Sequence, residues 1–196
     1  MKHSISNEGF LYRLRPIELS DAQTIIDIRL EDKERNKFIH SISPDIKMQE
    51  KWLADYFERE EDYYFMVENK FTNRAEGLIS IYNISDRRGE WGRYVIKKDS
   101  FAAVESALMC FEIAFEVLNL DEIFGGIIAE NTPVINLHKS YGAVMTNTVQ
   151  NTYEIGNQFY DMIEMTITKN NYFEKTKPKL EKISKSIYDR FIAEQS

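Results

Sequence analysis

The sequence predicts a mixed α/β fold in which helices flank a mostly antiparallel sheet. The chain has 196 residues, of which 43% are hydrophobic, with 8 glycines and 4 prolines, as is typical of globular proteins. At this length roughly 70% of the unfolded surface can be buried, so one core suffices without metals or disulfides. Strand-like and helix-like apolar patterns alternate along the chain without a repeat or a linker. We therefore expect one domain over residues 1–196, with a C-terminal helical extension from about residue 170.

The first half of the chain is expected to form one strand, two helices and a three-stranded antiparallel meander. Alternating or β-rich apolar runs indicate the strands, and apolar residues spaced three and four apart indicate the helices. Ser20 and Asp21 precede the first helix and are suitable N-cap residues. The expected elements are strand 11–16, helix 22–30, helix 48–57, and strands 63–67, 77–82 and 91–96.

The second half begins with the clearest helix of the chain, whose apolar residues repeat at helical spacing from Val104 onward. A continuous apolar run then predicts a buried strand, and a short helix follows that ends near Gly142. A turn at Gly156 and Asn157 joins two β-rich stretches, and the pattern after Pro178 predicts a final amphipathic helix. The expected elements are strand 123–128, helix 134–141, strands 144–155 and 159–168, and helix 180–191.

Composition and missing motifs disfavour several classes of function. The net charge of −7 disfavours nucleic-acid partners, and no run resembles a membrane span or a signal peptide. With a single cysteine, Cys110, we expect a cytoplasmic protein without a membrane partner. Cys110 falls within a helical apolar pattern, so we expect it to be buried and not nucleophilic. His3, His40 and His138 lack zinc-ligand spacing, and there is no P-loop, Gly-x-Gly-x-x-Gly or Gly-x-Ser-x-Gly. We therefore expect no metal site.

The segment 97–103 links an expected strand directly to the strongest expected helix. Backbone amides at a helix start, together with the positive end of the helix dipole, favour a bound anion. The small residues Ser100, Ala102 and Ala103 would let a phosphate approach that backbone. An ordinary strand-to-helix turn contains the same residue types, so the pattern alone leaves both interpretations open.

The order of elements resembles that of the GNAT acyl-CoA N-acyltransferases. The resemblance covers residues 10–168 and is closest in residues 90–96, 100–108, 114–116 and 131–142. It implies a GNAT fold whose sheet opens as a V between the fourth and fifth expected strands, where acetyl-CoA or another acyl-CoA binds as co-substrate. The implied coenzyme A contacts are Val95, Ile96 and Lys97 for the pantetheine arm, Lys98, Ser100, Phe101, Ala102 and Ala103 for the pyrophosphate, and Asn131.

The family's motifs match this sequence only in part. The pyrophosphate motif has Arg or Gln, then Gly, then Gly or Ala, at positions that correspond to Lys97, Ser100 and Ala102, and only Ala102 fits. Because Ser100 is small and Lys97 keeps a positive charge, we expect a shifted phosphate geometry and not a lost site. Ala143 replaces the phenylalanine that usually ends the family's later stretch.

The resemblance also implies catalytic roles. Glu90 occupies the place of an acidic residue in many relatives and is the candidate base, although a water chain or a merely solvated glutamate would also fit. His138 falls where many members carry the tyrosine that protonates the leaving thiolate, and an imidazole with a pKa near 6.5 suits such an acid. A helix histidine bonded to a backbone carbonyl is an equally weighted alternative. In that case Tyr141, one helical turn on, is the candidate acid.

Three stretches, 90–96, 100–108 and 137–142, resemble the GNAT branch encoded with surface-polysaccharide genes. This resemblance implies transfer of an acyl group, acetyl by default, to a nucleotide-linked amino-deoxysugar, by direct attack on the thioester. The expected acceptor contacts, each of which also has a plain surface or core interpretation, are Arg29, Arg35, Phe38 and His40.

Other functions and assemblies stay open at this point. One alternative is a protein N-terminal acetyltransferase of the ribosomal-protein type, and another is a GNAT-like module that binds coenzyme A without turnover. The sequence allows a homodimer, and it identifies neither the nucleotide, the sugar nor the acyl chain.

Overall fold

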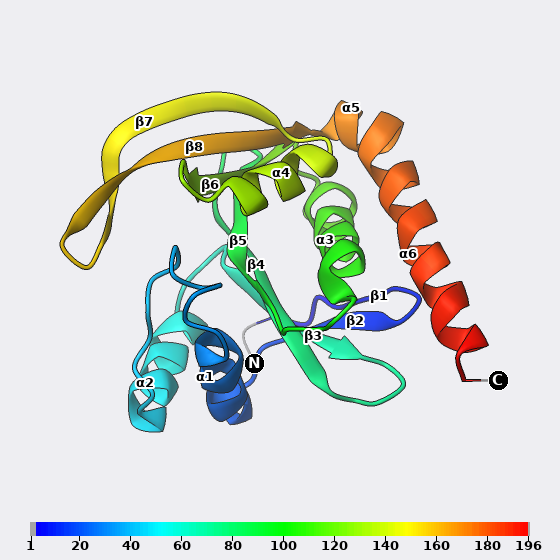
Figure 1. The fold of residues 1–196 in the computed structure, drawn as a ribbon, viewed down its shortest axis with the longest axis horizontal. Coiled ribbons are helices and arrows are strands. Elements are labelled where there is room, and N and C mark those ends of the chain that lie inside the picture. The colour runs from blue at the N-terminus through cyan, green and yellow to red at the C-terminus, as the bar shows by residue number, and fades with distance from the viewer. Residues whose placement is uncertain (1–2, 196) are drawn as a thin grey trace.

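Eight strands form one mixed sheet within residues 3–195, which are the residues that the computed structural model describes (Figure 1). The strand order is β1-β2-β3-β4-β5-β6-β8-β7, and the pair β5 and β6 is parallel whereas the other neighbouring pairs are antiparallel. The strands are β1 Asn7–Glu8, β2 Tyr12–Pro16, β3 Tyr63–Asn69, β4 Ala75–Ser85, β5 Arg88–Ile96, β6 Glu122–Ile128, β7 Val144–Ile155 and β8 Gln158–Thr168.

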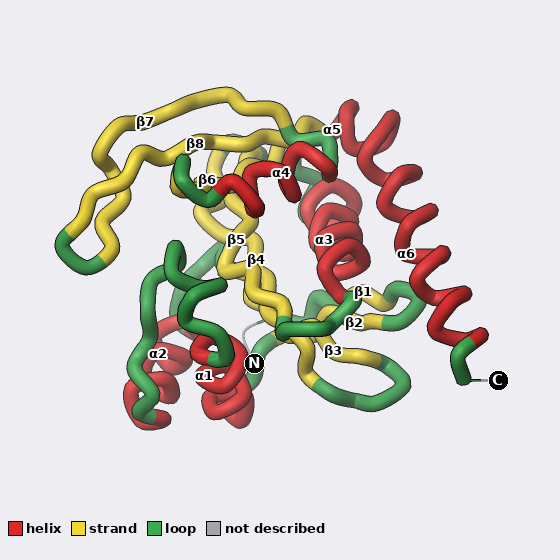
Figure 2. The backbone as a smooth tube through the Cα atoms, in the orientation of Figure 1, coloured by secondary structure: helices red, strands yellow, loops and turns green. Residues whose placement is uncertain are grey.

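Helices cover both faces of this sheet (Figures 1 and 2). Helices α1 and α2 share one core cluster with β3, β4 and β5, whereas α3, α4 and α6 contribute to the cluster on the opposite face. A π-helical segment, Ile113–Val117, continues α3, and another, Tyr172–Thr176, precedes α6. The helices are α1 Ala22–Leu30, α2 Ile46–Phe57, α3 Ala102–Glu112, α4 Thr132–Ser140, α5 Lys169–Asn171 and α6 Lys177–Ala193.

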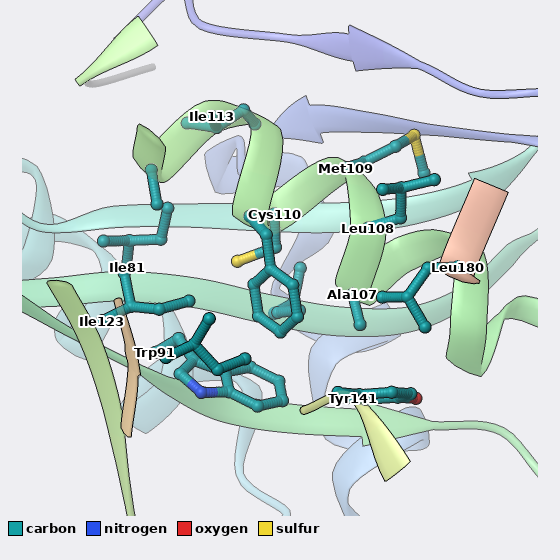
Figure 3. Close-up of a cluster of buried hydrophobic side chains, with 14 of the residues drawn as sticks. Ile81, Trp91, Ala107, Leu108, Met109, Cys110, Ile113, Ile123, Tyr141 and Leu180 are labelled. Carbon is teal, nitrogen blue, oxygen red and sulfur yellow. The ribbon is translucent and has the colours of Figure 1, made fainter. Parts of the chain in front are cut away.

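The core on the α3 face is packed around aromatic rings. Trp91 of β5 lies in this cluster together with Cys110 and Tyr141 (Figure 3). Its ring meets Phe111 of α3 edge to face, with centroids 5.0 Å apart. Cys110 is completely buried in this core, and burial raises the pKa of its thiol. The expectation of a buried cysteine is confirmed, and a thiol held in its neutral form is a poor nucleophile.

The elements expected from the sequence are present, with ends that differ by a few residues. The helix expected from Val104 begins at Ala102, whose N–H donates to the Ser100 hydroxyl in the turn before it. Strand β1 and helix α5 are not predicted by the pattern, since two or three polar residues carry no periodicity. The predicted mixed sheet with its mostly antiparallel order is confirmed.

The sheet splays between β5 and β6. Their pairing covers three positions and ends where Glu90 faces Phe124. Beyond that point β5 runs on to Ile96 and β6 to Ile128 without a pairing between them. The V implied by the resemblance is therefore present, and one edge of β5 lacks ladder partners on β6.

Two kinds of structure are not found among residues 3–195. None of their helices has both the length and the apolar character needed to cross a membrane. They also contain no group of three or more His, Cys, Asp or Glu side chains arranged to hold a metal ion.

Candidate active site

Two buried ring nitrogens near the splay have no hydrogen-bond partner among the described residues. They are Nε1 of Trp91 on β5 and Nδ1 of His138 on α4, whose rings stack with centroids 4.5 Å apart. Both lie against Gly125 of β6, where an added Cβ would be 2.6 Å from His138 Cε1 and 3.4 Å from Trp91 Nε1. Since buried polar atoms normally find partners, these nitrogens fit a site that receives a polar group from a ligand.

Strand β5 contains a bulge just after its last pairing with β6. The register against β4 shifts there, so that Arg93 and Tyr94 together oppose Ile79. Arg93 has a φ of 46°, which the extra residue of a bulge can adopt. Because of the bulge, Trp91 and Tyr94 both pack toward α3, whereas Arg93 lies near the ring of Trp52 on α2.

The turn between β5 and α3 binds a carboxylate. The backbone N–H of Lys98 donates to Glu31 Oε2 at 2.8 Å, and Lys97 Nζ lies 4.0 Å from Glu31 Oε1. Glu31 thus stands in for the kind of anion that this turn was expected to bind. Phe101, the N-cap residue of α3, is 67% exposed beside it. The turn has the donors and the positive charge that a phosphate oxygen requires.

Ser100 has a structural role at the start of α3. Its hydroxyl donates to Glu76 Oε2 at 2.6 Å and accepts from the N–H of Ala102 at 3.1 Å. The hydroxyl is therefore already engaged, and Glu76 places a negative charge behind the turn. A phosphate there would depend on the lysines and on the helix amides, not on the Ser100 hydroxyl.

Tyr141 is engaged at the same helix start. Its hydroxyl donates to the carbonyl of Ala103 at 3.1 Å, and the Tyr94 hydroxyl donates to the same oxygen at 2.5 Å. Burial, and then the nearby Tyr94, raise the pKa of the Tyr141 hydroxyl. This hydroxyl would have to leave the Ala103 carbonyl before it could protonate a ligand.

His138 is 5% exposed, and burial lowers its pKa to about 4. The imidazole is therefore neutral at neutral pH, with one N–H donor and one acceptor nitrogen. The alternative of a carbonyl partner is not seen for Nδ1, which has no partner among the described residues. Whether His138 acts on the leaving group stays a prediction.

Glu90 is held at the point where β5 and β6 separate. Its two carboxylate oxygens accept hydrogen bonds from the Tyr82 hydroxyl and the Asn83 side-chain amide, both at 2.8 Å. Glu90 is partly buried, so it differs from a freely solvated strand-end glutamate. Two fixed hydrogen bonds orient the carboxylate, and its role as a base stays a prediction.

A cavity of about 550 Å³ lies between α1, α2 and the bulge of β5. Its described lining contains no Asp or Glu. Four aromatic rings, from Trp52, Tyr64, Tyr82 and Tyr153, and three guanidinium groups, from Arg29, Arg59 and Arg93, line it. Because Tyr82 also holds Glu90, the cavity lies beside the candidate base.

The positive charge of this cavity is only partly neutralised. Asp62 forms a two-pronged ion pair with Arg93, at 2.6 and 2.9 Å, and lies 3.6 Å from Arg59. Arg29 has no carboxylate partner among the described residues and donates to the carbonyl of His40 at 2.6 Å. Arg59 and Arg93 thus share Asp62, Arg29 has no carboxylate partner among the described residues, and the cavity favours an anionic ligand.

The structure separates the expected acceptor residues into two groups. Arg29 and His40 line the cavity, and His40 packs against Tyr153 of β7 with ring centroids 4.8 Å apart. Phe38 packs against Tyr160 of β8, and neither Phe38 nor Arg35 lines the cavity. The loop between α1 and α2 therefore reaches the β7–β8 hairpin, and its residues 39–43 line one side of the cavity.

Several lining residues were not expected from the sequence, among them Arg93 and the aromatic residues Trp52, Tyr82 and Tyr153. No sequence signal separates these rings from ordinary core aromatic residues. Their common position depends on the bulge and on contacts between segments that are distant in the chain.

The remaining expected contacts lie along β5 and at the end of β6. Val95 lines the cavity and Ile96 packs on the α3 side, so their side chains occupy opposite faces of the sheet. Only their backbone is therefore available to a ligand in the splay. Asn131 is the N-cap residue of α4, and its carbonyl accepts from the N–H of Ile135 at 3.0 Å. Contact of these residues with coenzyme A stays a prediction.

Comparison with solved structures reveals the same fold in several enzymes. A GCN5-related N-acetyltransferase from Brucella melitensis gives a TM-score of 0.79 at 16% identity, over 95% of this chain and 86% of that one. Spermidine N-acetyltransferase from Vibrio cholerae, in complex with CoA and spermine, gives 0.74 at 18% identity, over 85% and 100%. FdhC, a nucleotide-linked sugar GNAT, gives 0.72 at 24% identity, over 89% and 98%.

The search of curated proteins gives no match. The family model of the acetyltransferase (GNAT) domain matches residues 14–164, which is most of the chain and includes the splay, the turn and the cavity. The chain therefore belongs to the GNAT acetyltransferase family and is an acyl-CoA-dependent N-acyltransferase.

Proposed function

We propose that the protein transfers an acyl group from acyl-CoA to the amine of a nucleotide-linked amino-deoxysugar. The observation that carries this proposal is the charge of the 550 Å³ cavity, which arginines line without an Asp or Glu among its described residues. A polyamine such as spermidine carries several positive charges, which these guanidinium groups would repel. The diphosphate of a nucleotide sugar, in contrast, matches the guanidinium fork in charge and geometry.

The aromatic rings of the cavity support this choice without deciding it. Trp52, Tyr82 and Tyr153 give the cavity aromatic surface against which a nucleobase or the apolar face of a sugar can pack. A polyamine would also be attracted to such faces by cation–π interactions. Arg93, however, already lies over the Tyr82 ring at 4.3 Å. The arginines therefore discriminate between the two acceptor classes, and the rings add affinity.

In the proposed reaction one amide bond forms and one thioester bond breaks. The acceptor ammonium first loses a proton, and the amine lone pair then attacks the acyl carbon. The attacking nitrogen loses a second proton as the C–S bond breaks, and the released thiolate takes up one proton, so that one proton is released overall. Glu90 is the proposed base, directly or through water, because Tyr82 and Asn83 orient its carboxylate beside the cavity. Direct attack agrees with Cys110 being buried and therefore unavailable as an acyl carrier.

His138 and Trp91 are the proposed partners of the leaving group. Each has a buried ring nitrogen without a partner among the described residues, next to the splay. A neutral imidazole donates through its N–H, and the indole N–H is a second donor. Tyr141 is the alternative acid, but its hydroxyl is committed to the Ala103 carbonyl.

The substitution Arg29→Gln tests the charge argument. Arg29 has no carboxylate partner among the described residues, so its removal leaves no buried acid unpaired. We expect KM for a UDP- or dTDP-linked amino sugar, measured by thiol release, to rise about 10-fold, the loss of one charged hydrogen bond. Arg35→Gln, outside the cavity, is the matched control and should leave KM unchanged. Equal KM values in the Arg29→Gln variant and the wild type would contradict the proposal.

A further inference from the structure

A second cavity, of about 400 Å³, lies between the start of α3 and the C-terminal half of α6. Its apolar wall comes from Phe101 on one side and from Ile183, Ile187 and Phe191 on the other. The ring of Phe101 is 67% exposed, which is unusual for a phenylalanine next to an apolar wall. This second cavity therefore offers a flat aromatic face to a ligand.

Lys182 and Arg190 border the second cavity, and both are exposed. Within residues 3–195 neither side chain has an ion-pair partner, whereas Lys177 and Lys185 of the same helix pair with carboxylates. One carboxylate, from Glu194, also lines the cavity. Two unpaired cations beside an aromatic face form an anion-binding surface on a chain whose net charge is −7.

We propose that this second cavity binds the 3′-phosphoadenosine end of acyl-CoA, an inference that rests on the proposed binding of acyl-CoA at the β5–α3 turn. Phe101 joins the two places, because it is the N-cap residue of α3 and also a wall of the cavity. If the pyrophosphate of acyl-CoA is bound at Lys97 and Lys98, where the Glu31 carboxylate lies, the adenosine end of the same molecule can reach the cavity past Phe101.

The chemistry of that ligand end matches the lining. Adenine has a flat π face that can stack on Phe101, and its ribose carries a 3′-phosphate that can pair with Lys182 and Arg190. Helix α6 lies outside residues 14–164, the part matched by the family model. The C-terminal extension thus acquires a role, namely to read the 3′-phosphate that distinguishes coenzyme A from its dephosphorylated form.

Calorimetry with coenzyme A and with 3′-dephospho-coenzyme A tests this role without any acceptor. We expect the wild type to bind coenzyme A about 10-fold more tightly than 3′-dephospho-coenzyme A, because the 3′-phosphate accepts charged hydrogen bonds from Lys182 and Arg190. In the double variant Lys182→Met/Arg190→Met the two ligands should bind within about 2-fold of each other. Lys185→Met, which removes one positive charge from α6 outside this cavity, is the control and should keep the preference of the wild type.

A second pair of variants tests the adenine contact. Phe101→Ala should weaken binding of both ligands about 5-fold or more, whereas Phe101→Tyr should restore it and 4′-phosphopantetheine should bind both variants equally. The inference is overturned if the double variant keeps the preference for the 3′-phosphate, or if Phe101→Ala changes only the oligomeric state. In both cases acyl transfer would persist, so the proposed function would survive. A wild type that binds no coenzyme A would remove the inference and the proposed function together.

Discussion

The wild type should lose stability as the pH falls, and replacing His138 by alanine should make this loss smaller. Burial lowers the pKa of His138 from 6.5 to about 4. Between these two pH values the unfolded chain binds a proton at His138 and the folded protein does not, so the free energy of unfolding falls as the pH falls. Each pKa unit corresponds to about 1.4 kcal/mol, so His138 accounts for a loss of roughly 3 kcal/mol across this window.

Urea unfolding of the wild type and of His138→Ala at several pH values between 7.5 and 4 measures this effect. The variant loses packing against Trp91 at every pH, so the informative quantity is the change of the difference between the two proteins with pH. We expect the variant to be less stable at pH 7.5, and the difference to shrink by roughly 3 kcal/mol toward pH 4.

The titration of Glu105 does not interfere with this measurement. Burial raises its pKa to about 7, so the folded protein binds more protons at Glu105 between pH 4.5 and 7 and loses stability there as the pH rises. That slope has the opposite sign and is common to both proteins, so it cancels in their difference. A difference that stays constant from pH 7.5 to 4 would refute the assignment of a neutral, desolvated imidazole.

Three other substitutions test the site. Glu90→Gln should lower kcat about 10²- to 10⁴-fold with unchanged acyl-CoA affinity, measured by thiol release and calorimetry, and wild-type turnover would remove Glu90 as the base. Tyr141→Phe should lower the free energy of unfolding by about 1 kcal/mol through the lost bond to Ala103. A large fall in kcat of this variant with unchanged stability would instead indicate that Tyr141 protonates the leaving thiolate. Gly125→Ala should cost about 1–3 kcal/mol because the new methyl lies 2.6 Å from His138 Cε1. Gly126→Ala, whose new methyl meets only the flexible Met162 side chain, should cost less. Equal losses of stability in the two variants would contradict a close packing of His138 on Gly125.

Apolar periodicity predicts most of the fold because its elements follow one another closely in the chain. The meander of β3, β4 and β5 pairs consecutive strands, and α3 has a continuous apolar pattern up to its π-helical segment. The splay between β5 and β6 is not predicted by periodicity. It was implied by the family resemblance, since nothing in residues 91–96 or 123–128 indicates that two neighbouring strands should stop pairing.

The candidate site is less predictable because it depends on local irregularity and on distant contacts. Simple alternation along β5 would place Trp91 and Arg93 on the same face, and the bulge sends Arg93 to the other one. The partners of functional groups also lie far away in the sequence. Glu76 accepts a hydrogen bond from the Ser100 hydroxyl, and the ring of Tyr153 packs against His40. Sequence reasoning places the turn and Glu90, but it does not reveal the arginine-lined cavity.

Acceptor choice is tested most directly by thiol release from acetyl-CoA with the purified wild type. The panel consists of UDP- and dTDP-linked amino-deoxysugars, spermidine and N-terminal peptides, all at equal concentration. We expect kcat/KM for at least one nucleotide-linked amino sugar to exceed that for spermidine by about 100-fold, which corresponds to about 2.7 kcal/mol from charge complementarity. The nucleotide sugar should gain the mass of one acyl group. A preference for spermidine or a peptide would contradict the proposed acceptor. The proposal would also be contradicted if the protein binds acetyl-CoA but releases no thiol with any acceptor of the panel.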